Sequence, residues 1–123
     1  MILPCIAYGN RVVAVPSLKA ALIVADFYQL LDTSDVPGGV INLVTGVPSE
    51  LATVLAAHDD VAAIWAVGPA DECEQIKKES AGNLKSVWTS DGKSPDWYDS
   101  QAEGSSWLER ATQVKNIWVP YGE

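Results

Sequence analysis

Three turns in this sequence place glycine, proline or a small hydroxyl residue directly after an apolar, β-branched run: Pro16-Ser17, Thr45-Gly46 and Gly68-Pro69. If each run is a strand of an open parallel sheet, each turn leads into a helix at the carboxyl end of its strand, where such sheets bind ligands. A helix N-terminus offers free N–H groups and a positive dipole end to a phosphate. The turns are therefore the candidate ligand-binding positions, although βα connections also use these residues for geometry alone.

The third of these turns is poorly suited to a phosphate group. Pro69 has no backbone N–H to donate. Asp71 and Glu72 fall in the first turn of the helix that follows, where their carboxylates satisfy the dipole and would repel a bound anion. We expect no pyrophosphate to bind at Gly68-Pro69.

Residues that could act as nucleophile, base or metal ligand lack suitable neighbours. Cys73 lies between Glu72 and Glu74, where formation of the thiolate is disfavoured. His58 is expected to end a helix, where its polar side chain complements the carbonyl groups. Cys5, Cys73 and His58 do not match the spacing of a zinc site, and both cysteines are expected to stay reduced. We predict no catalytic residue and no metal site.

Composition limits the partners of the chain. It has 123 residues, 48% of them hydrophobic, with a formal net charge of −8 from 8 Lys and Arg against 16 Asp and Glu. Such a charge repels phosphate backbones and anionic headgroups, so nucleic acid is not expected as a partner. The apolar runs fall far short of the roughly 20 residues that span a bilayer, and no signal sequence is evident. We expect one cytoplasmic domain with no membrane partner.

Strand and helix patterns alternate along most of the chain. Strands are predicted over residues 11–15, 40–45, 61–67 and 85–89, and helices over 3–8, 18–33, 48–58 and 70–81. Ser17 is the predicted cap of the 18–33 helix. The apolar residues expected on its buried face are Ile23, Phe27, Leu30 and Leu31. Alternation at this spacing predicts an α/β fold: a Rossmann-like open, mostly parallel sheet with helices on both faces.

The composition changes to Asp, Ser, Gly, Pro and Trp over residues 90–106. We divide the chain into a domain over residues 1–95, a linker over 96–106 and a C-terminal part over 107–123. This last part is predicted to hold a short helix over 107–111 and an extra strand over 114–119, outside the βα alternation. An apolar strand of this kind can add to a sheet edge elsewhere. The proposed interaction residues are Val114, Ile117, Trp118 and Val119.

Several stretches, taken in order, resemble the coenzyme domain of the aldehyde dehydrogenase superfamily over about residues 3–95. They are Gly9-Asn10-Arg11-Val12-Val13 with Pro16-Ser17, Val40 to Gly46, His58 to Val61, Gly68, Asn83-Leu84-Lys85 and Gly92-Lys93. The stretch Thr112 to Lys115, before Ile117 and Val119, resembles the family's C-terminal strand, which takes part in oligomerisation. The chain most resembles the degenerate, shortened second unit of tandem enzymes of the aldehyde dehydrogenase 16 type.

The departures from the family pattern fall on its working residues. Val15 and Leu18 stand where the family places the lysine and glutamate that hold the adenosine ribose. Ala66-Val67-Gly68-Pro69 replaces its Phe-Thr-Gly-Ser turn, and neither the general-base glutamate nor the region of the nucleophilic cysteine is found. We therefore expect no cofactor. The vestigial cofactor positions are Val15, Pro16, Ser17, Gly46, Gly68 and Pro69.

Two functions remain open. The first is a non-catalytic aldehyde-dehydrogenase-like module that serves assembly or protein interaction in a larger aldehyde dehydrogenase, with another such domain or a second copy as partner. The alternative is the NAD(P)-binding portion of an aldehyde dehydrogenase whose catalytic cysteine lies on another domain. A different ligand in the vacated cleft is also compatible with the sequence.

Overall fold

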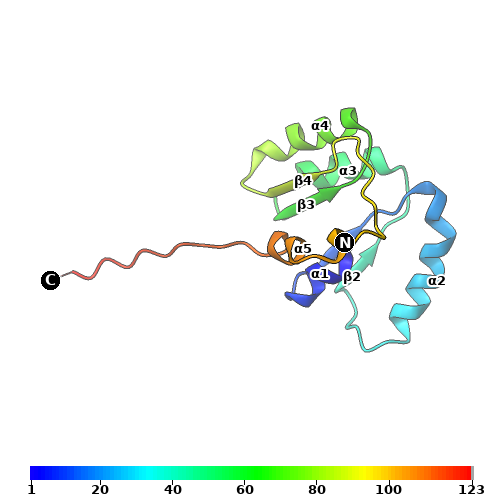
Figure 1. Cartoon of the computed structure of the whole chain (residues 1–123), viewed down its shortest axis with the longest axis horizontal. Coiled ribbons are helices and arrows are strands. Elements are labelled where there is room, and N and C mark those ends of the chain that lie inside the picture. The colour runs from blue at the N-terminus through cyan, green and yellow to red at the C-terminus, as the bar shows by residue number, and fades with distance from the viewer. Residues whose placement is uncertain (123) are drawn as a thin grey trace.

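The computed structural model describes residues 1–122 and confirms the alternation of strands and helices (Figure 1). The parallel units run β1 (Val12–Ala14), α2 (Ala21–Asp32), β2 (Ile41–Leu43), α3 (Pro48–Ala57), β3 (Ala63–Ala66), α4 (Ala70–Glu79) and β4 (Ser86–Thr89). Helix α1 (Ile2–Ala7) precedes them and α5 (Ser105–Arg110) follows. Short 3-10 helices occupy Leu18–Ala20, Ser80–Gly82 and Ser100–Glu103. The α/β class predicted from the sequence is confirmed.

The strands pair in two separate parallel sheets. β1 pairs with β2, with Val13 opposite Asn42, and β3 pairs with β4, with Trp65 opposite Trp88. Within residues 1–122 no ladder joins one sheet to the other. The strands are therefore parallel as predicted, but they form two separate two-stranded sheets.

Helices lie on both faces of the β3–β4 sheet, with α4 and α5 on opposite sides in Figure 1. Trp107 of α5 packs against Trp65 and Trp88 on that sheet. Helix α1 contacts both β1 and α5, while α3 contacts α4. The amide of Asn10 also donates to the carbonyl of Ala111 at 2.9 Å, tying the end of α1 to the end of α5.

Local residues explain where several elements end or begin. Gly9 adopts a φ of +78°, the left-handed conformation that stops α1. Pro48 occupies the start of α3, where its missing N–H costs nothing. Ser17 occupies the predicted N-cap position with an extended backbone, but its side chain makes no capping hydrogen bond, and the helical region begins as the 3-10 turn Leu18–Ala20 before α2.

The core of the isolated chain is thin. The buried hydrophobic residues are Ile41, Ala56, Cys73, Ile76 and Trp107. On α2, Phe27 and Leu31 are half-buried, but Ile23 and Leu30 are 68% and 62% exposed, so the predicted buried face is only partly covered. The accessible surface is 9378 Å², against roughly 6,400 Å² for a compact monomer of this mass. Large apolar side chains, among them Ile23, Leu30 and Trp118, contribute to this exposed surface.

The C-terminal segment differs from the prediction. Residues 112–122 form neither helix nor strand and extend away from the domain in Figure 1. The strand predicted over 114–119 is therefore not formed, because a strand needs a neighbour for its peptide groups and none of the described residues supplies one. The predicted linker is also partly helical, since it holds Ser100–Glu103 and the first residues of α5.

Candidate functional site

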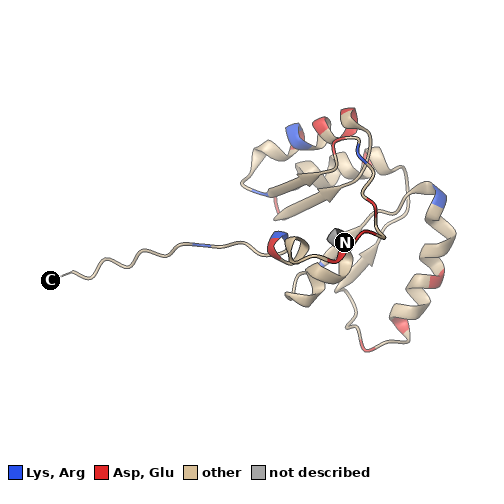
Figure 2. Cartoon of the chain, in the orientation of Figure 1, with Lys and Arg blue, Asp and Glu red and all other residues tan. Residues whose placement is uncertain are grey.

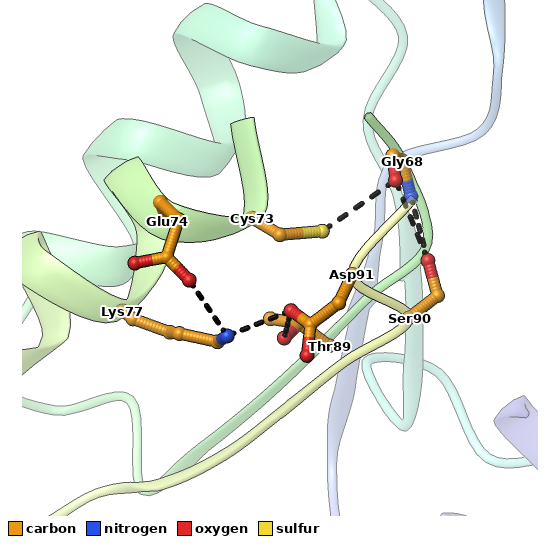
Figure 3. Close-up of polar contacts among 7 residues, drawn as sticks. All are labelled: Gly68, Cys73, Glu74, Lys77, Thr89, Ser90 and Asp91. Carbon is orange, nitrogen blue, oxygen red and sulfur yellow. Dashed lines mark hydrogen bonds and ion pairs between the residues drawn. The ribbon is translucent and has the colours of Figure 1, made fainter. Parts of the chain in front are cut away.

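The turn after β3 is bound to the segment after β4 (Figure 3). The N–H of Gly68 donates to the Ser90 hydroxyl at 3.2 Å, and that hydroxyl lies 3.4 Å from the Gly68 carbonyl. The N–H of Gly92 donates to the same carbonyl at 3.1 Å. Ser90 is 7% exposed. The backbone donor that this βα turn would present to a phosphate is therefore already engaged.

The segment after β4 also lies against the first residue of α4. Asp91 and Gly92 have φ values of +50° and +79°, which fold the chain back sharply. A Cβ atom placed at Gly92 would come within 3.4 Å of the backbone nitrogen of Ala70, the first residue of α4. This close approach places the loop against the N-terminus of the helix.

An ion pair fixes the same loop from the side of α4, as Figure 3 shows. The Nζ atom of Lys77 lies 2.7 Å from Oδ1 of Asp91 and 3.0 Å from Oε1 of Glu74. The Thr89 hydroxyl donates to the same Asp91 oxygen at 2.6 Å. The hydrogen bonds from Lys77 and Thr89 lower the pKa of Asp91, and the bond to Asp91 raises the pKa of Lys77.

Acidic and basic residues lie at opposite ends of α4 (Figure 2). Asp71 and Glu72 lie in its first turn, and Lys77 and Lys78 in its last. Acidic groups near the N-terminus and basic groups near the C-terminus both complement the helix dipole. This arrangement matches the prediction that Asp71 and Glu72 compensate the helix dipole after the Gly68-Pro69 turn.

Neither cysteine is placed for nucleophilic chemistry. Cys73 is fully buried, and its thiol donates a weak hydrogen bond to the Gly68 carbonyl at 3.6 Å. Burial raises the pKa of Cys5, which disfavours its thiolate. Both thiols are free. Thus Cys73 contributes to packing under the Gly68 turn.

The C-terminus of α3 is complemented by a residue that the sequence did not single out. The ammonium of Lys85 donates to the carbonyls of Ala56 at 2.5 Å and His58 at 2.8 Å. His58 instead accepts the N–H of Asp60 at its Nδ1 atom, at 3.2 Å. His58 ends α3 as predicted, but its side chain does not complement the helix carbonyls, whereas Lys85, which immediately precedes β4, does so. No spacing rule in the sequence connects these two positions.

The other residues predicted as cofactor positions lie at the carboxyl edge of the β1–β2 sheet. Val15, Pro16 and Ser17 follow β1, and Gly46 follows its parallel partner β2, so these turns leave the sheet on the same side. A Cβ atom at Gly46 would lie 2.9 Å from a terminal methyl of Leu51. A side chain at Gly46 would therefore require the Leu51 side chain to shift. The structure thus divides the six predicted positions between its two sheets, with Gly68-Pro69 apart from the rest.

A cluster of tryptophans surrounds Trp107, and the sequence patterns did not predict it. The Trp107 ring centroid lies 4.8 Å from that of Trp88, 5.4 Å from Trp65 and 5.9 Å from Trp97. The guanidinium of Arg110 sits 5.6 Å from the Trp88 centroid, a cation–π geometry. The one signal in the sequence is the clustering of Trp residues around β4 and α5. These rings anchor α5, from which the C-terminal segment departs.

Within residues 1–122, no group of three or more His, Cys, Asp and Glu side chains is arranged to hold a metal ion. In the same range, no helix has both the length and the apolar character needed to cross a bilayer.

Known proteins resemble this chain over most of its length. The sequence matches the aldehyde dehydrogenase family over residues 1–113. It is 38% identical over 93 residues to a (Z)-2-((N-methylformamido)methylene)-5-hydroxybutyrolactone dehydrogenase of Acinetobacter baylyi, covering 75% of this chain and 19% of that protein. It is 34% identical over 90 residues to an NADP/NAD-dependent aldehyde dehydrogenase of Escherichia coli, covering 72% of this chain and 18% of that one.

The structural likeness agrees with the sequence likeness. A crystal structure of an aldehyde dehydrogenase from Bartonella henselae superposes with a TM-score of 0.67 at 31% identity, over 72% of this chain and 18% of that protein. The chain thus spans about a fifth of the length of the relatives it matches. With the family match extending over residues 1–113, this chain belongs to the aldehyde dehydrogenase family.

Proposed function

We propose that this chain is a non-catalytic aldehyde-dehydrogenase-like module that serves the assembly of a larger aldehyde dehydrogenase. Its partner is another aldehyde dehydrogenase domain or a second copy, in the manner of the shortened second unit that the sequence resembles. A cytoplasmic location belongs to the same proposal. The observation that carries it is the unpartnered C-terminal segment, where Ile117 and Trp118 are 84% and 92% exposed.

Loss of cofactor binding is supported by the turns themselves. The Gly68 N–H is bound to Ser90 rather than left free. Val15 and Leu18 carry no group that could bind a ribose hydroxyl. Removing hydrogen-bonding groups from a site weakens its affinity for polar ligands, because the ligand's own groups then lose water without compensation.

An assembly role is supported by the chemistry of the C-terminal segment. In an extended chain, Lys115, Ile117 and Val119 share one face, and Val114 and Trp118 share the other. Apolar groups on both faces suit a strand that is covered by a partner, while the peptide groups pair along a sheet edge. Uncovered, the same residues expose large apolar surface to water.

The test is deletion of residues 111–123 followed by measurement of molar mass by light scattering, alone and in mixtures with an aldehyde dehydrogenase domain of the same organism. The full chain is expected to form a complex that the shortened chain does not form. A matched point variant is Trp118→Ser, with Tyr121→Ser as its control beyond the predicted strand. Assembly that survives the deletion unchanged would refute the proposal.

A second candidate, an NAD(P)-binding portion of an aldehyde dehydrogenase, is favoured by one arrangement. The turns Pro16-Ser17 and Thr45-Gly46 leave the paired strands β1 and β2 on the same side, where parallel sheets bind ligands. Calorimetric titration with NAD and NADP separates the two candidates. Micromolar binding would favour this second function, and no heat of binding would favour the first.

A further inference from the structure

We propose that the tryptophan cluster around Trp107 forms a binding site for a small aromatic monocarboxylate. The rings of the ligand contact the indoles, and its carboxylate binds the guanidinium of Arg110. The site lies between α5 and the segment that connects β4 to α5, away from the turns at Gly46 and Gly68. The inference goes beyond the assembly role and does not depend on it.

A cavity of about 310 Å³ lies beside Trp107. Its walls come from β4, from the segment between β4 and α5, and from α5 itself. Ligand sites in proteins begin at about 300 Å³ and are lined mainly by apolar and aromatic groups with a few polar ones. The cavity has that size and that kind of lining. The residues that decide its chemistry are Trp88, Trp97, Trp107, Asp96, Asp99 and Arg110.

The indoles form an aromatic wall that is only partly covered. The ring of Trp107 is 9% exposed, with the Trp88 and Trp97 centroids 4.8 Å and 5.9 Å away. Trp97 itself remains 45% exposed. Aromatic rings in contact attract one another beyond the effect of burying their surface. A planar aromatic ligand that covers the exposed part of Trp97 therefore gains more than an aliphatic one.

Arg110 supplies the positive charge of the cavity. Its guanidinium carbon lies 5.6 Å from the centroid of the Trp88 ring. Among the residues that the structure describes, no carboxylate forms an ion pair with it. A guanidinium stacked on a ring keeps its N–H donors at the edge of its plane, in the forked arrangement that matches a carboxylate. Arg110 can therefore bind the carboxylate of a ligand whose rings contact the indoles.

The two aspartates of the lining restrict the charge of the ligand. Asp96 accepts the N–H of Tyr98 at 3.0 Å, and Asp99 accepts the hydroxyl of Ser100 at 3.4 Å, so both carboxylates bind within their own loop. Together with the net charge of −8, they repel a dianion more strongly than a monoanion. A cationic ligand is opposed by Arg110. The charges therefore favour a monocarboxylate over a phosphate ester or an organic cation.

The experiment titrates the full chain with naphthoate and follows the indole N–H signals by proton–nitrogen correlation NMR. We expect saturable shifts of the Trp88, Trp97 and Trp107 signals. Trp118 is an internal control, because its ring is 92% exposed on the C-terminal segment. Naphthamide has the same rings without the charge and should bind about tenfold more weakly, the equivalent of about 1.4 kcal/mol.

Two further probes test the charge of the ligand with the ring system unchanged. Naphthyl phosphate carries a second negative charge, and naphthyltrimethylammonium carries a positive one. Both should bind more weakly than naphthoate, because the aspartates oppose the first and Arg110 opposes the second. Tighter binding of either probe would overturn the assignment of a monocarboxylate.

Three variants separate the contribution of charge from that of the rings. Arg110→Met removes the guanidinium and should weaken naphthoate binding about tenfold or more, with little effect on naphthamide. Arg11→Met is the matched control, since this exposed arginine before β1 gives the same change in net charge. Trp97→Ala should weaken naphthoate and naphthamide alike, because it removes only a ring contact. Circular dichroism checks folding, and the probe series on the unmodified chain remains decisive if a variant does not fold.

Four results would overturn the inference. They are no shift of the cluster signals at about 10 mM naphthoate, equal affinity for naphthoate and naphthamide, equal losses in Arg110→Met and Arg11→Met, and shifts of the Trp118 signal as large as those of Trp107. The last result would show that naphthoate adsorbs on exposed apolar groups in general.

Discussion

The hydroxyl of Ser90 engages both polar groups of the Gly68 residue, accepting its N–H at 3.2 Å and lying 3.4 Å from its carbonyl. Ser90 follows β4 and Gly68 follows β3, so two adjacent carboxyl ends of parallel strands are bound to each other. Parallel sheets use these ends to hold ligands. In this protein the Ser90 hydroxyl accepts the hydrogen bond from the Gly68 N–H, which is the donor that a ligand would need.

Substitution Ser90→Ala should lower the free energy of unfolding by about 1–3 kcal/mol, because it leaves the Gly68 N–H without its acceptor. Urea denaturation followed by tryptophan fluorescence measures this change. The matched control is Ser94→Ala, an exposed serine four residues further along, with an expected change within about 0.5 kcal/mol. Equal effects of the two substitutions would show that the Ser90 contact contributes nothing specific.

The same substitution should not restore cofactor binding. Freeing the Gly68 N–H leaves Val15 and Leu18 without ribose-binding groups and leaves Glu72 beside the turn, with Oε2 placed 3.4 Å from where a Gly68 Cβ would lie. Calorimetric titration of Ser90→Ala with NAD is therefore expected to show no binding at millimolar concentration. Binding that appears only in this variant would show that Ser90 alone closes the site.

The sequence predicted the order of elements well because local patterns determine it. Glycine at position 9 and proline at position 48 set boundaries that the structure reproduces. Pairing between strands depends on neighbours in space. The separation of β1–β2 from β3–β4, and the lack of a strand at residues 114–119, therefore could not be predicted from local patterns.

The sequence predicts only part of the candidate site, because the rest depends on contacts between residues far apart in the chain. The unsuitable chemistry at Gly68-Pro69 could be inferred from proline and the acidic residues beside it. The contact with Ser90 could not, because it joins residues 22 positions apart. Lys85 was missed similarly, since its contacts with the end of α3 span 27 and 29 positions. Long-range contacts of this kind are determined by the fold.

Substitution Trp107→Ala should destabilise the chain more than loss of the Ser90 contact does. Trp107 is 9% exposed and packs against Trp65, Trp88 and Trp97, so truncation removes a large buried ring and leaves a cavity. The expected loss is about 3–5 kcal/mol. Thermal unfolding measures it, with Trp118→Ala as the matched control, because that ring is 92% exposed. Comparable losses in both variants would contradict the anchoring role of Trp107.

At the end of α3, loss of the Lys85 ammonium should cost more stability than loss of the His58 side chain. Lys85→Met keeps the length of the side chain but removes the donor to the carbonyls of Ala56 and His58, with an expected cost of about 1–2 kcal/mol. His58→Ala removes only the acceptor of the Asp60 N–H and should cost less than about 1 kcal/mol. Denaturation midpoints of the two variants give the comparison, and the reverse ranking would mean that His58, and not Lys85, complements the helix end.

The ion pair between Asp91 and Lys77 should make stability depend on pH at both extremes. Hydrogen bonds from Lys77 and Thr89 lower the pKa of Asp91 below its ordinary 3.8, so its contribution is fully present above that value. The contribution is lost as the pH falls further, through the lowered pKa. Lys77 behaves oppositely: its pKa is raised above 10.5, so its contribution is present below that pH and lost as the pH rises through the raised value.

The substitution Asp91→Asn tests the acid limit. Its melting temperature should lie below that of the unmodified chain by a constant amount between about pH 5 and pH 9, with the difference shrinking below pH 3.8 as Asp91 is protonated. Because both groups are partly exposed, the difference should also shrink as salt is added. Asp35→Asn, in the exposed turn after α2, serves as the control. A difference that persists unchanged into acid would mean that Asp91 holds the loop through its shape and hydrogen bonds, and that its charge is not what binds Lys77.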